Sequence, residues 1–252
     1  MAQPLPPVQM LWVGGPLSTL ERLSLTSFLR NGHEVHLYSY GRPANTPKGL
    51  VVKDAGEILA LPKLETSVET DAASTVEAVR FSDRFRSKLL HERGGIWSDI
   101  DVICLKPLAF ANGMDYFFAS QVMPAQPGDE GRMRVRASNC MMKVPVNSPV
   151  MHDCLLGAAD EASGPTRLHN ALEKFNLLGA LLNPNLFCPI PFWNVATLLT
   201  GPTTLPPDAC GVHFWSESWR RNFFDRNASY DSLSLFERLK THYLGQRARK
   251  ES

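Results

Sequence analysis

The first 41 residues place the strongest restriction on the fold. Residues 8–15 (VQMLWVGG) combine an apolar run with a glycine turn, as a strand end does, and residues 17–32 carry apolar side chains at helical spacing before Gly32. Residues 33–41 (HEVHLYSYG) alternate between apolar and polar side chains, which is typical of a strand. A strand, a helix and a strand in this order are joined by a right-handed connection and lie parallel in one sheet. The chain is therefore predicted to begin as an α/β fold.

The expected elements continue to alternate as far as residue 144, and then the pattern changes. Residues 74–95 form the clearest helix, which Gly94 and Gly95 bring to an end, and residues 96–105 (IWSDIDVICL) follow as a strand. The other expected elements are strands at 115–122 and 136–144, a helical region over 148–182, proline-rich aromatic segments, and an amphipathic helix at 232–244. We expect a single domain over residues 1–252, in which a mostly parallel central sheet is flanked by helices and followed by a helical, loop-rich C-terminal part.

Charge and hydropathy exclude several classes of protein. The formal net charge is +1, so the chain has no global basic field that would indicate binding to nucleic acid. Its first residues lack the basic segment and apolar stretch of a secretory signal. No stretch reaches the ~18 uninterrupted apolar residues of a membrane span. We therefore expect a cytoplasmic protein that does not bind nucleic acid.

The five cysteines are widely spaced, odd in number and mostly embedded in apolar runs. They are Cys104, Cys140, Cys154, Cys188 and Cys210. Because no C-x-x-C pair occurs, the spacing supports neither a zinc site nor a disulfide framework. Buried, reduced thiols are expected.

Two carboxylates interrupt the apolar strand that is predicted at 96–105. Asp99 and Asp101 are two positions apart, so both side chains would point to the same side of that strand. Unpaired charges in an apolar setting would cost several kcal/mol, so either a cation lies between them or they emerge at the end of the strand. Oxygen ligands of this kind suit Mg²⁺ or Mn²⁺. By itself, the D-x-D spacing is equally consistent with two acids that meet water.

The preceding helix carries a third acid on a defined face. Val79, Asp83, Arg86 and Leu90 fall on one side at helical spacing, which puts Asp83 beside Arg86. This is either an ordinary intrahelical ion pair or a pair that faces a polar ligand. In the second case it would lie at the carboxyl end of the sheet, where α/β folds bind their substrates.

Residues 81–108 (FSDRFRSKLLHERGGIWSDIDVICLKPL) resemble the core signature of the DXD-motif, sugar-nucleotide-dependent glycosyltransferases. That signature is S-D-x-x-R, a helix, G-G-[IV]-[YW]-x-D-x-D and an exit like L-K-P-L, and each part is present. The family includes capsular polysaccharide enzymes, yeast α-mannosyltransferases and, more distantly, the large clostridial glucosylating toxins. The resemblance implies a GT-A-like fold, in which residues 1–144 bind the nucleotide sugar and residues 145–252 form the acceptor side and close the C-terminus.

Two shorter segments of the N-terminal part are similar to the same family. LWVGGPLS (11–18) resembles its I-W-x-G-G strand end, which implies that Trp12 stacks on the nucleotide base and favours uracil. An aromatic residue of the core is the alternative for Trp12. SNCMMKVP (138–145) resembles the family's S-N-x-[MI] strand, which implies that Asn139 lies near the sugar.

The C-terminal part resembles the family only over short segments. VHFWSESWRR (212–221) is similar to the late His-x-Trp segment, which implies that His213 completes the metal shell or contacts the diphosphate. In the same segment Trp219 would donate its indole N–H to the leaving phosphate. A histidine satisfied by a backbone partner is the alternative for His213. Residues 176–194 (NLLGALLNPNLFCPIPFWN) depart from the family pattern, so the resemblance assigns no acceptor-side residue there.

The resemblance implies a metal-dependent transferase. The enzyme would move a hexose from a nucleoside-diphosphate sugar to a hydroxyl of a glycan or glycolipid, with retention of configuration, in surface polysaccharide synthesis. Mn²⁺ or Mg²⁺ would stabilise the departing diphosphate, with Asp101 as the firmest ligand. Asp99 would bridge to ribose, sugar or metal, and Asp83 with Arg86 would hold sugar hydroxyls.

Two other functions and one location follow from particular segments. The chain is alternatively a non-catalytic module that binds sugar nucleotides or glycans. SDIDVI (98–103) also resembles D-x-D-x-[TV], the phosphatase motif of the haloacid dehalogenase group, with Ile103 at its last position, and in that motif Asp99 would be the nucleophile. The basic tail RARK (247–250) suggests peripheral association with the anionic inner face of the membrane, where a lipid-linked acceptor would lie.

Overall fold

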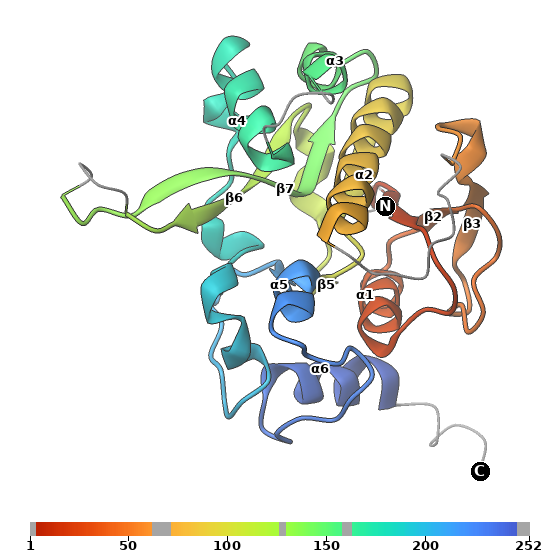
Figure 1. Ribbon diagram of the computed structural model, residues 1–252, viewed down its shortest axis with the longest axis vertical. Helices are drawn as coiled ribbons and strands as arrows, with labels where there is room; N and C mark the ends of the chain where they lie inside the picture. Colours follow the sequence, from red (N-terminus) through yellow and green to blue (C-terminus); the bar gives the residue numbers. More distant parts are fainter. Residues whose placement is uncertain (1–3, 62–71, 126–129, 158–162, 246–252) are drawn as a thin grey trace.

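A computed structural model of the protein describes residues 4–61, 72–125, 130–157 and 163–245. Over these residues the chain forms eight strands and six α-helices (Figure 1). The strands are β1 (Val8–Trp12), β2 (Val35–Ser39), β3 (Val51–Asp54), β4 (Gly95–Ser98), β5 (Val102–Cys104), β6 (Phe117–Met123), β7 (Arg134–Val144) and β8 (Gly211–His213). The helices are α1 (Thr19–Arg30), α2 (Ala72–Arg93), α3 (Pro149–Leu156), α4 (Gly164–Lys174), α5 (Ser216–Arg221) and α6 (Leu235–Leu244).

Six of the strands form one central sheet in the order β3-β2-β1-β4-β7-β6. The first four are parallel to one another, and β7 runs antiparallel to both of its neighbours. The opening β1-α1-β2 unit confirms the predicted strand, helix and strand. The predicted α/β fold with a mostly parallel sheet flanked by helices is also confirmed, while the short strands β3 and β8 were not expected from the sequence.

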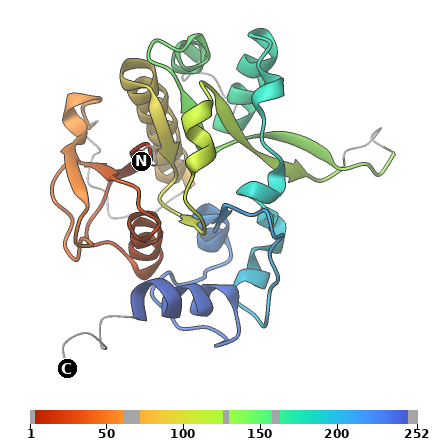
Figure 2. The same ribbon diagram turned by 180° about the vertical axis from the view of Figure 1, so that it is seen from behind.

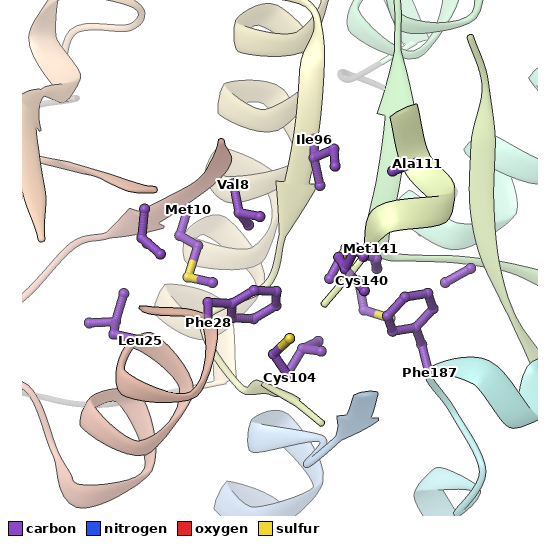
Figure 3. Packing of buried hydrophobic residues seen from close by; sticks show 14 of the residues in the cluster. Val8, Met10, Leu25, Phe28, Ile96, Cys104, Ala111, Cys140, Met141 and Phe187 are labelled. Carbon is purple, nitrogen blue, oxygen red and sulfur yellow. The ribbon is translucent and has the colours of Figure 1, made fainter. Parts of the chain in front are cut away.

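Helices cover both faces of the sheet, because each central strand alternates its apolar side chains between two cores. Val8 and Met10 of β1 pack with Leu25 and Phe28 of α1 on one face, as Figure 3 shows. Leu11, on the same strand, points to the other core. That core is closed by α2, α3 and α4, and α2 lies in front of the strands in Figure 1 and behind them in Figure 2.

The C-terminal part packs on the opposite side of α1 rather than on the central sheet. Leu20 and Leu23 of α1 join Phe214, Trp219 and Phe236 in a third, largely aromatic core. Short 3₁₀ turns, η5 (Pro184–Leu186) and η6 (Phe192–Leu198), carry the chain between α4 and β8. This is the helical, loop-rich C-terminal part that the proline content predicts.

The single strand predicted at 96–105 is wrong, since the structure divides it into two strands in different sheets. Gly94 and Gly95 have φ values of +60° and +88°, and a Cβ on Gly94 would lie 2.6 Å from the backbone nitrogen of Val146. Glycine is therefore required where α2 turns into β4. After Ser98 the chain turns, with the N–H of Val102 bonded to the carbonyl of Asp99, and β5 pairs antiparallel with β8 in a separate two-stranded sheet.

The turn places both acids of the D-x-D sequence outside any strand. The acids therefore emerge at the end of a strand, as one of the two explanations expects, and this position leaves room for a cation between them as well. The region predicted as helical over 148–182 contains α3, α4 and the 3₁₀ turn η4 (Leu178–Ala180). No helix among the described residues is long and apolar enough to cross a membrane, and the basic tail at 247–250 lies outside them.

Candidate active site at the carboxyl end of the sheet

Asp99 follows β4 directly and is held by groups of the central sheet. Its N–H donates to the carbonyl of Cys140 on β7 at 2.7 Å. Its Oδ1 accepts a hydrogen bond from the indole Nε1 of Trp97 at 2.8 Å and lies 3.0 Å from Nη2 of Arg86. Asp99 is thus fixed on the backbone and on the side chain.

Arg86 joins two carboxylates on the buried side of α2. Its Nη1 lies 3.3 Å from Oδ1 of Asp83, and its guanidinium lies over the ring of Trp97, 5.0 Å from the ring centroid. Asp83 and Arg86 lie together as their helical spacing predicts. Because Arg86 is also paired with Asp99, one buried cation partly neutralises two acids that come from different elements.

Asn139 and Gly164 complete this group around Asp83. Nδ2 of Asn139, on β7, donates to Oδ1 of Asp83 at 2.9 Å. Gly164 is the first residue of α4, and a Cβ built there would overlap both carboxylate oxygens of Asp83 and lie 2.5 Å from Nδ2 of Asn139. A side chain at this position would have to displace the ends of the Asp83 and Asn139 side chains. The sequence segment GPTRLHNAL resembles a G-P segment of the family, and that was the signal for Gly164.

Asp101 is held by the C-terminal part of the chain. Its Oδ1 lies 3.2 Å from Nε2 of His213, and its Oδ2 accepts a hydrogen bond from the N–H of Ser216 at 2.6 Å. Its backbone carbonyl accepts from the N–H of Phe214 at 2.9 Å. The pairing of Val102 with His213 across β5 and β8 sets this register.

The two acids differ in their titration. Burial raises the pKa of Asp99 above that of an ordinary carboxyl, an effect that Arg86 opposes and the charge of Asp101 reinforces. Burial would also raise the pKa of Asp101, but the attraction of His213 and the hydrogen bonds from His213 and Ser216 hold it well below its usual range. Burial alone would lower the pKa of His213, but the charge of Asp101 and the hydrogen bond to it, together with the neighbouring Cys140, raise this pKa well above its ordinary value. Asp101 is therefore the acid that stays ionised.

The donor atoms of Asp99, Asp101 and His213 fit a divalent cation. One oxygen of each carboxylate and one ring nitrogen lie within 4.8 Å of one another. Carboxylate oxygen and imidazole nitrogen together are donors that Mn²⁺ accepts, and Mg²⁺ prefers the oxygens. These are the three residues that the sequence predicts as metal ligands.

The two tryptophans that the resemblance assigns to the site lie in different surroundings. Trp12 ends β1 and is partly buried, with its Nε1 bonded to the carbonyl of Gly15 at 2.9 Å. Trp219 is fully buried among Phe214, Tyr230 and Phe236, and its Nε1 has no hydrogen-bond partner among the described residues. The structure therefore places Trp219 in the aromatic core and not on the surface of the site.

Trp215 is the aromatic residue that the sequence reasoning missed. Its ring lies against the ring of His213, with 3.9 Å between the centroids, and its Nε1 donates to the carbonyl of Ile190 at 2.8 Å. Trp215 is the tryptophan of the His-x-Trp segment itself, so the signal was present. Ser216 was also missed, because a backbone N–H leaves no mark in a sequence. Arg220 and Arg221, beside this segment, both pair with Glu217.

Comparison with known proteins gives the class. Residues 46–122 match the family described as "Glycosyltransferase sugar-binding region containing DXD motif". None of the curated protein sequences matches the chain. The matched segment contains Asp83, Arg86, Asp99 and Asp101, and it supports an assignment to the DXD-motif glycosyltransferases.

Solved structures that resemble the chain do so at low sequence identity. The PaToxG glycosyltransferase is 17% identical with a TM-score of 0.43, over 68% of this chain and 71% of that chain. The glycosyltransferase GlyE of Streptococcus pneumoniae TIGR4 is 12% identical with a TM-score of 0.48, over 87% of this chain and 61% of that chain. The WbbM bifunctional glycosyltransferase is 10% identical with a TM-score of 0.45, over 92% and 51%. This chain therefore spans less than two thirds of the last two.

Proposed function

We propose that the protein is a metal-dependent, retaining glycosyltransferase that moves a hexose from a nucleoside-diphosphate sugar, UDP-sugar being favoured, to a hydroxyl of a glycan or glycolipid. The observation that carries the proposal is the convergence of Asp99, Asp101 and His213 at the carboxyl end of the sheet, beside Asp83 and Arg86. Ligands bind at this edge in open α/β sheets. The acceptor would serve surface polysaccharide synthesis at the inner face of the membrane.

The residues of this chain have separate tasks in the proposed reaction. Asp101, Asp99 and His213 would hold Mn²⁺ or Mg²⁺, which when bound neutralises charge on the departing diphosphate. Asp101 is ionised and anchored by the N–H of Ser216, so it is the firmest ligand. Asp83 and Asn139, linked by their hydrogen bond, would bind hydroxyls of the donor sugar. Trp12 would stack on the nucleotide base at the end of β1.

The proposed division into a donor part (1–144) and an acceptor part (145–252) has one exception. His213 and Ser216 belong to the second part by number, yet they hold Asp101 of the first. We propose that the C-terminal part closes the donor site as well as forming the acceptor side. Trp219 would support this closure from the core instead of donating to the leaving phosphate.

A thermal-shift panel tests the donor and the metal together. The purified chain is heated with UDP-, GDP- and other nucleotide sugars, each with and without Mn²⁺, and with nucleoside monophosphates as controls. A bound donor stabilises the folded state and raises the apparent Tm of the protein. Because donor binding is proposed to need the cation, the Tm should rise only when Mn²⁺ is present. Donor sugars that give no metal-dependent shift in any combination would contradict the proposal.

Hydrolysis of the donor separates an enzyme from a binding module. With Mn²⁺ and without acceptor, the chain should release the sugar slowly from the nucleotide that shifts its Tm, and excess chelator should stop the release. A donor that binds but is never hydrolysed or transferred would favour the non-catalytic module. Turnover of simple phosphate esters through an acyl phosphate on Asp99 would favour the phosphatase.

A further inference from the structure

Two cysteine side chains meet beside the active-site histidine. Cys140 on β7 and Cys188, which follows η5, are 48 positions apart in the sequence, and their Sγ atoms lie 3.7 Å from each other. Both side chains are buried. A ring nitrogen of His213 lies within 4.8 Å of both sulfurs, so three buried donors converge on one point. The cysteine spacing in the sequence gave no sign of this group.

The separation of the sulfurs matches a metal site better than a disulfide. Two thiolates on a tetrahedral Zn²⁺ with Zn–S bonds of about 2.3 Å lie about 3.8 Å apart. A disulfide needs its sulfurs about 2.05 Å apart. The observed 3.7 Å therefore fits a shared cation without movement, whereas a disulfide would require the two sulfurs to come about 1.7 Å closer.

The ring of His213 is already oriented for a second ligand role. Its Nε2 faces Oδ1 of Asp101, while its Nδ1 is buried and has no hydrogen-bond partner among the described residues. A carboxylate that accepts the N–H of a histidine fixes the tautomer and leaves the other nitrogen free for a metal. Two sulfurs and one imidazole nitrogen are donors that Zn²⁺ prefers.

We propose that Cys140, Cys188 and His213 form a site for a thiophilic divalent cation, Zn²⁺, which shares His213 with the oxygen-rich site of the proposed sugar transfer reaction. Each thiol, and the Nδ1 of His213 where it carries a proton, releases that proton to solvent as the cation binds, and no oxidant or reductant takes part. Occupancy keeps the Nε2–H of His213 on Asp101, so His213 is no longer a ligand for Mn²⁺. Zn²⁺ at this site therefore raises the Mn²⁺ concentration that transfer requires.

The backbone connects this site to both acids of the D-x-D turn. The carbonyl of Cys140 accepts the N–H of Asp99 at 2.7 Å, and the carbonyl of Phe187, next to Cys188, accepts the N–H of His213 at 2.8 Å. A cation held by these two cysteines thus fixes the same segments that position Asp99 and His213.

Cobalt substitution tests the site without an activity assay. Co²⁺ bound to thiolate gives a charge-transfer band in the near ultraviolet, which carboxylate and imidazole ligands do not give. The wild-type chain, kept with a phosphine reductant, should show this band with one equivalent of Co²⁺ and lose it on addition of Zn²⁺. Cys140→Ser and Cys188→Ser should each lose the band, whereas Cys154→Ser, a change at another buried thiol, should keep it. Asp99→Asn should also keep it, which separates this site from the proposed transfer site.

Protection from alkylation tests the same site in the unmodified chain, in case a serine variant does not fold. With Zn²⁺ at about ten times its Kd, the open form from which a buried thiol reacts falls about tenfold in population. The rates for Cys140 and Cys188, mapped by mass spectrometry, should fall by that factor, and the rate for Cys210, the partly exposed thiol, should not. Absence of the Co²⁺ band in the wild type, a band that survives in both cysteine variants, or a Cys140–Cys188 disulfide that forms without metal protection would overturn the proposal.

Discussion

Around Asp99 the site is built from side chains of the central sheet and α2, whereas around Asp101 it is built from the backbone and one histidine of the C-terminal part. Asp99 shares the cation Arg86 with Asp83 and accepts from Trp97. Asp101 accepts from the N–H of Ser216 and faces His213. The pKa of Asp99 is raised, mainly by burial, and that of Asp101 is lowered by His213 and Ser216 despite burial. Two acids two positions apart can thus have pKa values shifted in opposite directions, because different parts of the chain surround them.

The largest effect is expected at Asp101. Asp101→Asn keeps the shape and the acceptor for Ser216 but removes the charge that would hold the cation. Loss of a metal's stabilisation of several kcal/mol lowers the rate of transfer on the order of 10³-fold. Initial rates at saturating Mn²⁺ measure it, with Asp99→Asn as the matched control and a smaller loss expected there. Equal losses in both variants would remove the distinction between the two sides.

The next largest effect is expected at Arg86. Arg86→Met leaves Asp83 and Asp99 without the buried cation that pairs with both. Breaking a buried pair in this way costs about 3–5 kcal/mol of the free energy of unfolding. Urea denaturation followed by circular dichroism measures the change. Arg84→Met is the control, because Arg84 lies on the same helix and has no ion pair among the described residues. An Arg86→Met chain as stable as wild type would mean that the Asp99 side does not depend on this network.

A smaller and more selective effect is expected at Gly164. The atoms that a Cβ would meet are the ends of the Asp83 and Asn139 side chains, which can rotate away, so Gly164→Ala should change the Tm little. The added methyl group introduces an overpacking strain of about 1–3 kcal/mol, which displacement of Asp83 relieves. Because Asp83 would bind the donor sugar, KM for the donor should rise about tenfold. The Mn²⁺ dependence should not move, because Asp101 is untouched. Gly179→Ala, where a Cβ has nothing within 4 Å, is the control. A changed Mn²⁺ requirement in Gly164→Ala would show that the two sides are not independent.

The smallest effect is expected on the pH dependence of the free energy of unfolding. It concerns His33, on the N-terminal side, whose pKa is shifted in the opposite direction to that of His213. Its Nδ1–H donates to the carbonyl of Pro6 at 3.0 Å and its Nε2 accepts from the N–H of Leu108 at 3.1 Å. Burial lowers the pKa of His33 below 6.5, and the bond to Pro6 opposes this weakly.

The direction of the pH effect follows from proton binding. Below pH 6.5 the unfolded chain binds a proton that folded His33 takes up only at lower pH, so the free energy of unfolding falls as pH falls through this window. Above pH 6.5 this contribution is complete. His33→Gln should flatten the decrease between pH 6.5 and 5 in urea titrations relative to wild type. An unchanged slope would show that His33 is not the group responsible.

The sequence predicts the N-terminal half well because its signals are local. Gly32 and Gly94 end α1 and α2 within the range of one helical turn, and the spacing of Asp83 and Arg86 on α2 already puts them together. The division of 96–105 could not be predicted in the same way. Its apolar residues continue on both sides of the turn, and the reason for the break is a partner strand, β8, more than a hundred residues later.

The C-terminal part of the site was predicted by residue type but not by position. His213 was expected near the acids and lies there, whereas Trp219, expected at the leaving phosphate, lies in the aromatic core, and Trp215 lies against His213 instead. The two tryptophans are four positions apart, and which ring faces the core depends on the turn at Trp215, whose φ is +54°. A non-glycine residue in this conformation leaves no local sequence signal.

The antiparallel pairing of β5 with β8 also orders events during synthesis. Ser216 follows Asp101 by 115 positions, which a ribosome working at about 5–20 residues per second covers in roughly 6–23 s. β1, β2 and β4 precede Asp101 and β7 follows within that interval, so these strands can pair before His213 and Ser216, the partners of Asp101, are made. A chain that stops early would carry the sheet and the acids but not the histidine. The cation site can therefore assemble only after residue 216 has been synthesised.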